Sequence, residues 1–596
     1  MEFISHLAKF NLVLLLICFS FSYFQTTKAC HETDKAALLD FKKNIIDEGP
    51  EKLLKTWNKD TDCCTQWDGV SCDYSNGRVV NVTRPGFFDE PEHPAGNTYM
   101  IGTISPSLGN LEFLRNKLED PVPMSFQHLH KLNRLYLHGN LLSGRIPSSI
   151  FEHMTALSEI SLTGNQLSGK LPLSVGKLVS LEMLDFSSNN FSGAIPITIG
   201  SLKNLIYLDL SLNHFSGGIP STVGSLKNLT HLDLSFNQIS GSIPPSIGDL
   251  SKLEIIYLNK NRLGGSIPSS FSKLISLMDC DMSDNKLTGG IPSSIGKMPV
   301  LQELLINDNM LTGNLPVSMG NLTGLRRLNL VNNRFTGEIP SSLGQLMNLN
   351  EVDLSRNFLS GPIPTQLVKL SSILSLLDLS YNPLGLANLP TWLSKMNYYF
   401  SLNLAGIGLA GELPEWLSSV NWVFLDLSSN MLTGELPTWI GNLSSLRALN
   451  LSNNHFHSDI PIEFKKLSNL EGLDLHSNNF IGGLRSILAK TTSGGVYTSS
   501  GQYSIIDLSY NMFAGPIDED MGNVDAMHSI QALILSHNKL TGTIPSEIIN
   551  SKWLGVFDVS HNMLTGEIPP HNTTFPATSF EGNSGLCGSP LPPCKA

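Results

Sequence analysis

Hydrophobic positions recur with a period of 24 residues along most of the chain. The segments LKNLIYLDLSLNHFSGGIPSTVGS, from Leu202, and LKNLTHLDLSFNQISGSIPPSIGD, from Leu226, show this period. In the first segment the recurring hydrophobic positions are Leu202, Leu205, Leu208, Leu210, Phe215, Ile219 and Val223. One unit cannot bury these side chains alone, whereas stacked units share a continuous core. The pattern therefore predicts a repeat solenoid.

An asparagine ends the L-x-L-x-x-N pattern of almost every unit, and we call this residue the ladder Asn. It occurs at Asn140, Asn165, Asn189, Asn213, Asn237, Asn261, Asn285, Asn309, Asn333, Asn357, Asn382, Asn430, Asn454, Asn478, Asn511, Asn538 and Asn562. One further unit has Ile407 in this place. Two irregular units precede these, which indicates about 20 units in total.

Each unit also predicts its own local structure. The L-x-L run alternates with period two and predicts a short strand whose intervening side chains face outward. The ladder Asn can bond backbone groups where the chain leaves the strand, so that stacked asparagines form a ladder. Gly217 permits a tight bend, and the following Ile-Pro pair predicts a short extended segment. The strands together predict a parallel sheet with an exposed concave face.

Composition and charge narrow the class of protein. The chain has 596 residues, 41% of them hydrophobic and only 15% charged, with a net charge of −12. Low charge with many hydrophobic residues argues against disorder. The acidic balance argues against nucleic acid as a partner, because phosphate binding needs a basic surface.

The N-terminus predicts a secreted chain. A hydrophobic run from Phe10 to Phe21 follows Lys9 and ends in a polar stretch that reaches Ala29, which is typical of a signal peptide. No later run approaches 18 apolar residues, so we expect no transmembrane segment. The predicted domains are a signal peptide at 1–29, an N-terminal cap at 30–78, the repeat array at 79–570 and a C-terminal cap at 571–596.

The cysteines gather at the two ends of the mature chain. Cys18 lies in the signal peptide, and the two end clusters consist of Cys30, Cys63, Cys64 and Cys72, and of Cys587 and Cys594. A secreted protein predicts disulfides here, and the first cluster leaves three pairings open. A zinc site is disfavoured because two of the cysteines are adjacent and no histidine has a suitable spacing. Cys280 occupies a leucine position and is expected to be buried.

The repeat and both ends resemble a known family. The repeat has the form LxxLxxLxLSxNxLSGxIPxxLGx; the front contains HETDKAALLDFKKNI, then Trp57, Asn58, Cys63, Cys64, the run Trp67 to Val70 and Cys72, and the end contains GNSGLCGSPLPPC. These features resemble plant extracellular leucine-rich repeat proteins, which include receptor-kinase ectodomains, receptor-like proteins, polygalacturonase-inhibiting proteins and DNA-damage-toleration-like secreted proteins.

The resemblance implies a fold and a set of disulfides. The expected fold is an α/β repeat solenoid, a curved right-handed superhelix of about 20 units of 24 residues with a parallel concave sheet and disulfide-bonded caps. The pairings that the resemblance implies are Cys30–Cys63, Cys64–Cys72 and Cys587–Cys594.

Three units depart from the pattern. The first carries 13 extra residues, FDEPEHPAGNTYM, which predict a surface loop. The second lacks six residues between Leu111 and Asn116, which amount to its strand. Because the loss of a strand would break the sheet, this deletion suggests a splice variant or a gene-model error. Nine extra residues lie within SILAKTTSGGVYTSSGQY, as a flexible bulge or as a counterpart of the island that interrupts the last repeats of some receptor-like proteins.

Two sets of exposed strand positions are candidates for binding. Four residues before the ladder Asn, an acidic stripe consists of Asp185, Asp209, Asp233, Asp281, Asp353, Asp378, Asp426, Asp474, Asp507 and Asp558. Because Asp belongs to the family consensus, we expect a structural role for this stripe. Six residues before the ladder Asn, and at some neighbouring positions, the middle units carry varied aromatic and charged residues, and Tyr and Arg are typical binding anchors. Our hypothesis is a concave ligand-binding patch, with ordinary surface variation as the alternative, made of Tyr207, His231, Tyr257, Asp279, Glu303, Arg327, Glu351 and Arg356.

Glycosylation sequons predict surface that a partner leaves uncovered. They occur at Asn81, Asn190, Asn228, Asn321, Asn442, Asn450 and Asn572. Two of them, Asn81 and Asn450, fall on predicted strands, where we expect poor occupancy.

Catalytic motifs are missing from the sequence. It contains no H-E-x-x-H, no G-x-S-x-G and no P-loop pattern, and its glycines recur with the repeat. We therefore expect neither an enzyme nor a cofactor nor a metal site.

The leading functional prediction is a secreted plant recognition protein of the apoplast or cell wall. It would bind a protein, a peptide or a wall polysaccharide on its concave face and act in defence or developmental signalling through a membrane partner such as a receptor kinase. An inhibitor of microbial cell-wall hydrolases and a truncated receptor ectodomain are the alternatives.

Overall fold

The computed structural model describes residues 29–47, 54–72, 79–83 and 132–594, apart from 397–399, 493–500 and 519–524, together with the short pieces 52, 77, 101–102, 111–112, 117–118 and 121–122. Residues 1–28 of the predicted signal peptide and the 13 inserted residues lie outside this part of the chain. The chain divides into two compact units, 1–240 and 241–596.

An N-terminal cap opens the first unit. Helix α2 (Glu32–Asn44) has acidic residues in its first turn and lysines in its last, as the helix dipole favours. It is followed in the chain by β1 (Ile45–Asp47) and by the antiparallel pair β2 (Val70–Cys72) and β3 (Val79–Thr83). Phe41, Trp57 and Trp67 are buried, and the two indoles stack at 5.4 Å between centroids.

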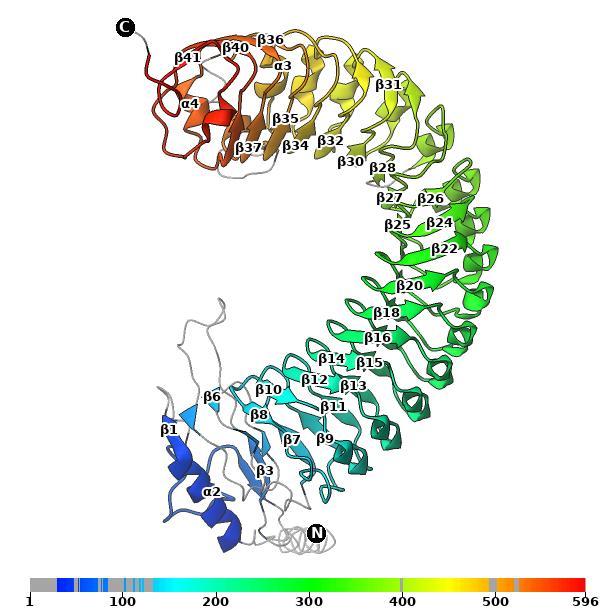
Figure 1. The fold of residues 1–596 in the computed structure, drawn as a ribbon, viewed down its shortest axis with the longest axis vertical. Coiled ribbons are helices and arrows are strands. Elements are labelled where there is room, and N and C mark those ends of the chain that lie inside the picture. The colour runs from blue at the N-terminus through cyan, green and yellow to red at the C-terminus, as the bar shows by residue number, and fades with distance from the viewer. Residues whose placement is uncertain are drawn as a thin grey trace, which may run out of the picture. The chain divides into compact units, whose positions relative to one another are not determined.

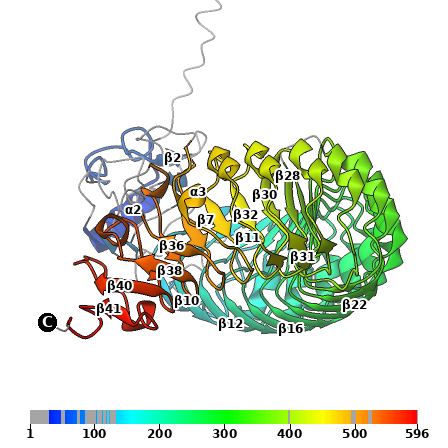
Figure 2. The same ribbon diagram turned by 90° about the horizontal axis from the view of Figure 1, so that it is seen from above.

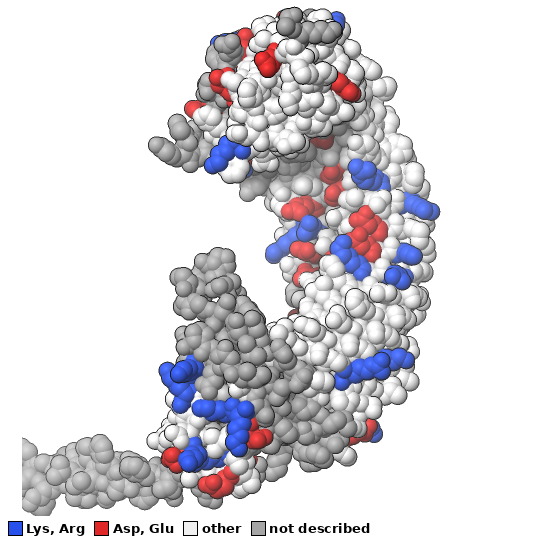
Figure 3. All heavy atoms as spheres, turned by 60° about the vertical axis from the view of Figure 1, so that its left-hand side comes forward, with Lys and Arg blue, Asp and Glu red and all other residues white. Residues whose placement is uncertain are grey.

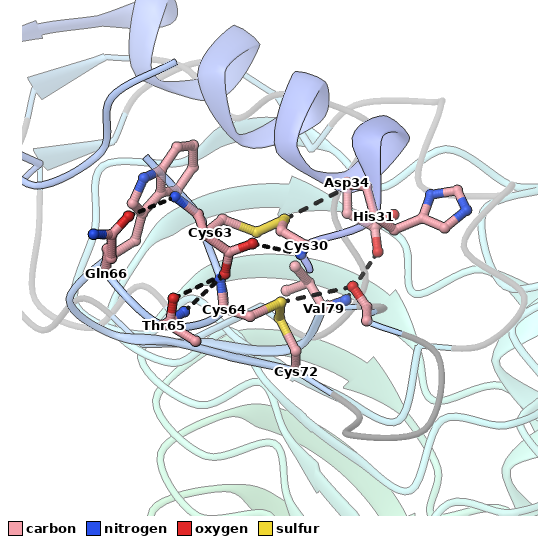
Figure 4. Close-up of a disulfide and its surroundings, with 12 residues drawn as sticks. Cys30, His31, Asp34, Cys63, Cys64, Thr65, Gln66, Cys72 and Val79 are labelled. Carbon is pink, nitrogen blue, oxygen red and sulfur yellow. Dashed lines mark hydrogen bonds between the residues drawn. A yellow bond between two sulfur atoms is a disulfide. The ribbon is translucent and has the colours of Figure 1, made fainter. Parts of the chain in front are cut away.

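Disulfides close both ends of the chain with the pairings that the resemblance implied. Cys30–Cys63 and Cys64–Cys72 lie beneath α2 (Figure 4), and Cys587–Cys594 lies at the C-terminal end. The backbone N–H of Val79 donates to Asp34 Oδ2 at 2.9 Å, which ties α2 to the first strand of the array. The prediction of disulfide-bonded caps is confirmed.

The main sheet of the first unit is parallel from β3 onward, with one short strand from each successive repeat. Neighbouring strands pair in constant register, as in Leu184↔Leu208↔Leu232. The further strands of this sheet are β5 (Leu111–Glu112), β7 (Arg134–Tyr136), β9 (Glu159–Ser161), β11 (Met183–Asp185), β13 (Tyr207–Asp209) and β15 (His231–Asp233).

The expected break in this sheet does not occur. Strand β5 has only two residues, yet it pairs with β3 on one side and with β7 on the other. Two residues suffice because sheet continuity requires only backbone N–H and C=O groups. The prediction that the short second repeat interrupts the sheet is therefore wrong.

The main sheet of the second unit has the same design (Figure 1). Parallel pairs run from Ile255↔Asp279 to Ala532↔Val556, and the register shifts once, between Phe400↔Trp422 and Ser401↔Phe424. Its strands are β17 (Ile255–Tyr257), β19 (Asp279–Asp281), β21 (Glu303–Leu305), β23 (Arg327–Asn329), β25 (Glu351–Asp353), β27 (Leu376–Asp378), β28 (Phe400–Asn403), β30 (Trp422–Asp426), β32 (Ala448–Asn450), β34 (Gly472–Asp474), β35 (Ile505–Asp507), β37 (Ala532–Ile534) and β39 (Val556–Asp558).

A second short strand follows the ladder Asn in most repeats. In the first unit these strands are β4 (Ile101–Gly102), β6 (Lys117–Leu118), β8 (Ser143–Arg145), β10 (Gln166–Gly169), β12 (Asn190–Ala194), β14 (His214–Gly217) and the start of β16 (Gln238–Ser242). In the second unit, where Figure 2 shows the last of them in succession, they are β18 (Arg262–Gly265), β20 (Lys286–Gly289), β22 (Met310–Asn314), β24 (Arg334–Gly337), β26 (Phe358–Leu359), β29 (Ala410–Gly411), β31 (Met431–Gly434), β33 (His455–Phe456), β36 (Ala514–Pro516), β38 (Lys539–Gly542), β40 (Met563–Glu567) and β41 (Gly585–Cys587).

The helical element of the regular repeats is a short 3-10 segment that begins after a proline. Proline presets an extended entry, as at Pro196 with φ −67° and ψ 139°. A Cβ on Gly176 would lie 2.5 Å from the carbonyl oxygen of Thr198, so glycine lets neighbouring segments approach closely. The regular segments are Leu173–Lys177, Ile197–Ser201, Ser221–Ser225, Pro245–Asp249, Ser269–Lys273, Ser293–Lys297, Val317–Asn321, Ser341–Gln345, Thr365–Leu370, Thr391–Lys395, Glu415–Ser419, Thr438–Asn442 and Ile462–Lys466.

Later repeats vary this element. They carry α3 (Arg485–Leu488), α4 (Ser546–Ile549) and the three-residue 3-10 turns Asp525–Met527 and Ala577–Ser579. Ile487, Leu488 and Tyr503 are fully buried. The two ends of the predicted bulge are therefore packed into the core, and its middle, 493–500, lies outside the described residues.

The core and the asparagine ladder match the prediction. The recurring leucines, such as Leu208 and Leu210, are fully buried. The side-chain amide of Asn213 donates to the carbonyl oxygen of Phe186 in the preceding repeat at 2.9 Å, and its Oδ1 accepts from the N–H of Phe191 at 2.9 Å. Asn213 therefore bonds its own coil to the preceding one, and Asn237 and Asn333 make equivalent contacts.

Candidate functional site

A row of charged side chains crosses four neighbouring strands of the second unit. Asp279, Glu303, Arg327 and Glu351 are the first residues of β19, β21, β23 and β25 and lie in direct register; we call them the charged row. Arg327 Nε lies 3.2 Å from Glu351 Oε2, and both side chains are more than 40% exposed. With three carboxylates and one guanidinium, the row is acidic and stays accessible to a ligand. Figure 3 shows acidic and basic side chains gathered next to one another on an otherwise largely uncharged face.

Arg356 and Tyr381 form a second feature of this sheet. The Arg356 guanidinium carbon lies 4.7 Å from the centroid of the Tyr381 ring, which is a cation–π contact. Both residues have a left-handed backbone, with φ of 53°, because each is the turn residue before a ladder Asn. Sequence reasoning selected Arg356 and missed Tyr381, which occupies the same place one repeat later. Tyr257 and Leu305 are half-buried third residues of their strands.

The first unit holds the aromatic pair of the predicted patch. The rings of Tyr207 and His231 stack with centroids 4.4 Å apart, and Tyr207 Oη donates to Asp209 Oδ2 at 3.3 Å. Burial, and then the carboxylates of Asp209 and Asp185, raise the pKa of Tyr207. Burial lowers the pKa of His231, and Asp209 acts in the opposite direction. The pair therefore offers a flat, neutral aromatic surface near neutral pH.

The aspartates of the acidic stripe bond the backbone that follows them. Asp353 Oδ1 accepts from the N–H of Ser355 at 3.0 Å and from its hydroxyl at 2.7 Å. The same pattern recurs at Asp281, Asp378 and Asp507. Burial raises the pKa of Asp353, and the carboxylate of Asp378 adds to this. These contacts support the structural role that we expected.

Cys280 is buried in β19, as predicted. Its side chain is 1% exposed, and its thiol is free. Burial raises the pKa of this thiol, and the carboxylates of Asp281 and Asp279 raise it further. Cys280 thus behaves as a small hydrophobic core residue.

His476 replaces the serine that most repeats carry two residues before the ladder Asn. Its Nδ1 lies 2.7 Å from Asp474 Oδ1, and its Nε2 lies 2.8 Å from Asn453 Nδ2. The hydrogen bond to Asp474 raises the pKa of His476, burial opposes this, and the charges of Asp474 and Asp507 add to the increase.

This contact predicts a pH-dependent contribution to stability. Because the pKa of His476 is higher in the folded state, its stabilisation is complete below the unfolded pKa of about 6.5 and is lost as pH rises through the folded value. We expect the free energy of unfolding to exceed that of His476→Ser by more at pH 5 than at pH 8, measured by urea unfolding. Asp474→Asn should reduce this pH-dependent difference, and a difference that grows with pH would contradict the assignment.

Two groups of the described residues place three potential metal ligands within 4.8 Å of one another. One is Cys30, Cys63 and Cys64, whose sulfurs are in disulfides; the other is Asp474, His476 and Asp507. In the second group Asp507 Oδ1 also accepts from Ser509. The hydrogen bond between His476 and Asp474 and the strand register of Asp474 with Asp507 account for the closeness of these side chains.

An open depression lies beside the last strands of the second unit, and sequence reasoning missed it. It has a volume of about 670 Å³, and we call it the edge depression; its lining is Arg447, Glu471, Gln502, Ser504, Ser529, Gln531 and Trp553. The sequence signal for this site was the tryptophan at Trp553, nine residues before its ladder Asn. The four preceding units carry polar residues at this position, which are Ser445, Asn469, Gln502 and Ser529.

The sequons differ in accessibility. Asn190, Asn321, Asn442 and Asn572 are exposed and Asn228 is half-buried, whereas the side chain of Asn81 lies outside the described residues. Asn450 is half-buried; it donates to Asp426 and accepts from Ser452. These two bonds hold the Asn450 side chain against the sheet, which supports the expectation of poor occupancy there.

Family profiles match the chain along most of its length. The leucine-rich repeat N-terminal domain matches residues 31–73, and the leucine-rich repeat region matches residues 220–407. Further leucine-rich repeats match at 131–152, 180–239, 424–480 and 529–551. Among the described residues, no helix is long and apolar enough to cross a membrane.

Several receptor ectodomains share this fold. The chain is 34% identical to the ectodomain of the receptor kinase GASSHO1/SCHENGEN3 from Arabidopsis thaliana, solved with CASPARIAN STRIP INTEGRITY FACTOR 2; the match has a TM-score of 0.68 and covers 83% of this chain and 61% of that one. It is 30% identical to the ectodomain of the Arabidopsis receptor kinase HAESA, solved with an IDA peptide hormone ligand, with a TM-score of 0.65 and coverage of 95% and 99%.

A receptor of known sequence also matches. Phytosulfokine receptor 1 from Arabidopsis thaliana is 36% identical over 143 residues, which are 23% of this chain and 13% of that receptor. The chain therefore spans less than two thirds of that receptor and of the GASSHO1 ectodomain. The repeats, the caps and these likenesses together show that the chain belongs to the plant extracellular leucine-rich repeat proteins.

Proposed function

We propose that this protein is an extracellular recognition protein that binds a peptide or an extended protein segment on the exposed face of its main sheet. Signalling would pass through a membrane partner. The observation that carries the proposal is the charged row, in which the side chains of Arg327 and Glu351 are more than 40% exposed and those of Asp279 and Glu303 are half-buried. These four charged residues stand where later strands begin with smaller residues such as Ala448, Gly472 and Ala532. The HAESA and GASSHO1 ectodomains, which share the fold, were each solved with a ligand.

The spacing of the charged row suits an extended peptide. Neighbouring strands lie about 4.8 Å apart, so the row from Asp279 to Glu351 is about 14 Å long, the length of about four extended residues. Glu351 partly neutralises Arg327, which leaves Asp279 and Glu303 as acceptors. A ligand segment with a basic residue near these two carboxylates is therefore favoured. In the first unit, the Tyr207–His231 pair offers an aromatic contact surface of its own.

Removal of the two carboxylates is expected to weaken ligand binding. Apoplastic fluid is passed over the immobilised full chain, and the retained peptides are identified by mass spectrometry and then titrated. We expect the double variant Asp279→Asn, Glu303→Gln to weaken binding about tenfold or more at low salt and to reduce its salt dependence. Arg327→Ala should also change the affinity.

A charge-matched control separates this effect from a change in net charge. Glu415→Gln with Glu547→Gln removes two exposed carboxylates from the helical segments of other repeats. This control is expected to bind like the unmodified chain. Equal peptide binding by all the variants would refute the proposed site.

A further inference from the structure

We infer that the edge depression of the second unit is a saccharide-binding subsite for a neutral oligosaccharide. It lies outside the charged row, at the edge of the main sheet where the last strands begin.

One side of the subsite is a column of polar residues directly before the strands. Arg447, Glu471, Ser504 and Gln531 immediately precede β32, β34, β35 and β37. The backbone N–H groups of Glu471, Ser504 and Gln531 each donate to the carbonyl oxygen of the preceding residue of the column, at 2.7, 2.7 and 2.8 Å respectively. The backbone therefore fixes the spacing at which the four side chains are presented.

The other side of the subsite consists of Gln502 and Ser529, which lie two residues before Ser504 and Gln531 in the chain. Gln502 is only 7% exposed, and the Ser529 hydroxyl donates to its Oε1, which fixes the amide with its NH₂ group as the donor. The segment that carries Gln502 is anchored on both sides: Lys490 Nζ donates to the carbonyl oxygen of Gly501, and Tyr503 Oη donates to that of Ile487 at 3.1 Å.

Trp553 supplies the aromatic surface. Its side chain is 58% exposed although it lines the depression, and Lys552 Nζ lies 4.6 Å from the ring centroid. The exposed apolar face of this ring suits the C–H face of a pyranose. The neighbouring amides, hydroxyls and charged groups suit the ring hydroxyls, which both donate and accept hydrogen bonds.

The lining also narrows the class of ligand. Arg447 and Glu471 contribute one positive and one negative charge, so the site favours an uncharged ligand over a polyanion such as pectate. None of the described lining residues is aliphatic, so this part of the site does not suit the hydrophobic anchor of a peptide. A volume of about 670 Å³ lies within the range of small-molecule sites.

The test is calorimetric titration of the full chain with four probes. Cellohexaose and a xyloglucan heptasaccharide represent free neutral wall sugars, a high-mannose glycopeptide represents a glycan on a partner protein, and hexagalacturonate represents an acidic sugar. We expect one of the three neutral probes to bind with a Kd on the order of 0.1 mM, and hexagalacturonate to bind more weakly. The neutral probe that binds identifies the source of the saccharide.

Two variants and a matched control test the residues. Trp553→Ala, and separately Gln531→Ala, should weaken the binding of that probe about tenfold, whereas Trp416→Ala, on the helical segment of another repeat, should not. Near-UV circular dichroism checks that the variants remain folded. The inference is overturned if no neutral probe binds at millimolar concentration, if hexagalacturonate binds best, or if Trp553→Ala binds like the unmodified chain. Because the charged row is a different surface, Trp553→Ala should leave peptide retention unchanged.

Discussion

Asn333→Ala is expected to lower the free energy of unfolding by about 3–5 kcal/mol. The Asn333 amide donates to the carbonyl oxygen of Ile306 at 2.9 Å, and its Oδ1 accepts from the N–H of Leu311 at 3.0 Å. Alanine would leave these backbone groups buried without partners, at about 1–3 kcal/mol for each group. It would also remove the bond to the carbonyl oxygen of Leu330 within the same coil.

Urea unfolding followed by circular dichroism measures this loss, and limited proteolysis locates it. Repeat proteins open locally, so the first new cleavage sites should fall in the repeats around Asn333. Asn348→Ala is the matched control, since this exposed side chain makes one bond, to the carbonyl oxygen of Thr323 at 2.9 Å. A loss below about 1 kcal/mol is expected for it, and equal losses for the two variants would contradict the ladder's role.

Removal of the Cys30–Cys63 disulfide is expected to cost about 4 kcal/mol. The two cysteines are 33 residues apart, and the closed loop limits the conformations of the unfolded chain. The double variant Cys30→Ser, Cys63→Ser keeps the size of both side chains. The measurement is the free energy of unfolding of the N-terminal cap, followed by the fluorescence of the stacked Trp57 and Trp67.

The C-terminal disulfide provides a graded comparison. Cys587 and Cys594 are 7 residues apart, so the same chain-entropy argument predicts a smaller cost, about 2.5 kcal/mol. The test is which disulfide costs more free energy of unfolding when it is removed, because the chain-entropy argument makes this order depend on loop length alone. A larger loss from the C-terminal pair would contradict it.

Features that repeat were predictable from the sequence. The period of 24 identified the buried positions of Leu208 and Leu210, the ladder contacts of Asn213 and the strand that begins at Tyr207. Each of these depends on contacts between equivalent positions of adjacent repeats, so one repeat predicts the next. Cys280 was predictable for the same reason, because it occupies a leucine position.

Features that depend on a single repeat were harder to predict. Strand β5 keeps the sheet continuous through two residues, although the spacing suggested a missing strand. The contact of Arg356 with Tyr381, and the edge depression around Trp553, arise from pairs of positions that no motif connects. Such sites require the side chains of several repeats to be placed together in space.

Hydroxyl-radical footprinting of the full chain with a captured peptide ligand tests the central claim most directly. Aromatic and sulfur-containing side chains report their own exposure, so Tyr207, His231, Tyr257 and Tyr381 serve as probes on the main-sheet faces of the two units. Met347, 57% exposed in the turn before β25, is the internal control. The account predicts that the ligand lowers oxidation of Tyr257 and Tyr381 several-fold and leaves Met347 unchanged. Protection of Met347 with unchanged oxidation of all four aromatic probes would contradict it.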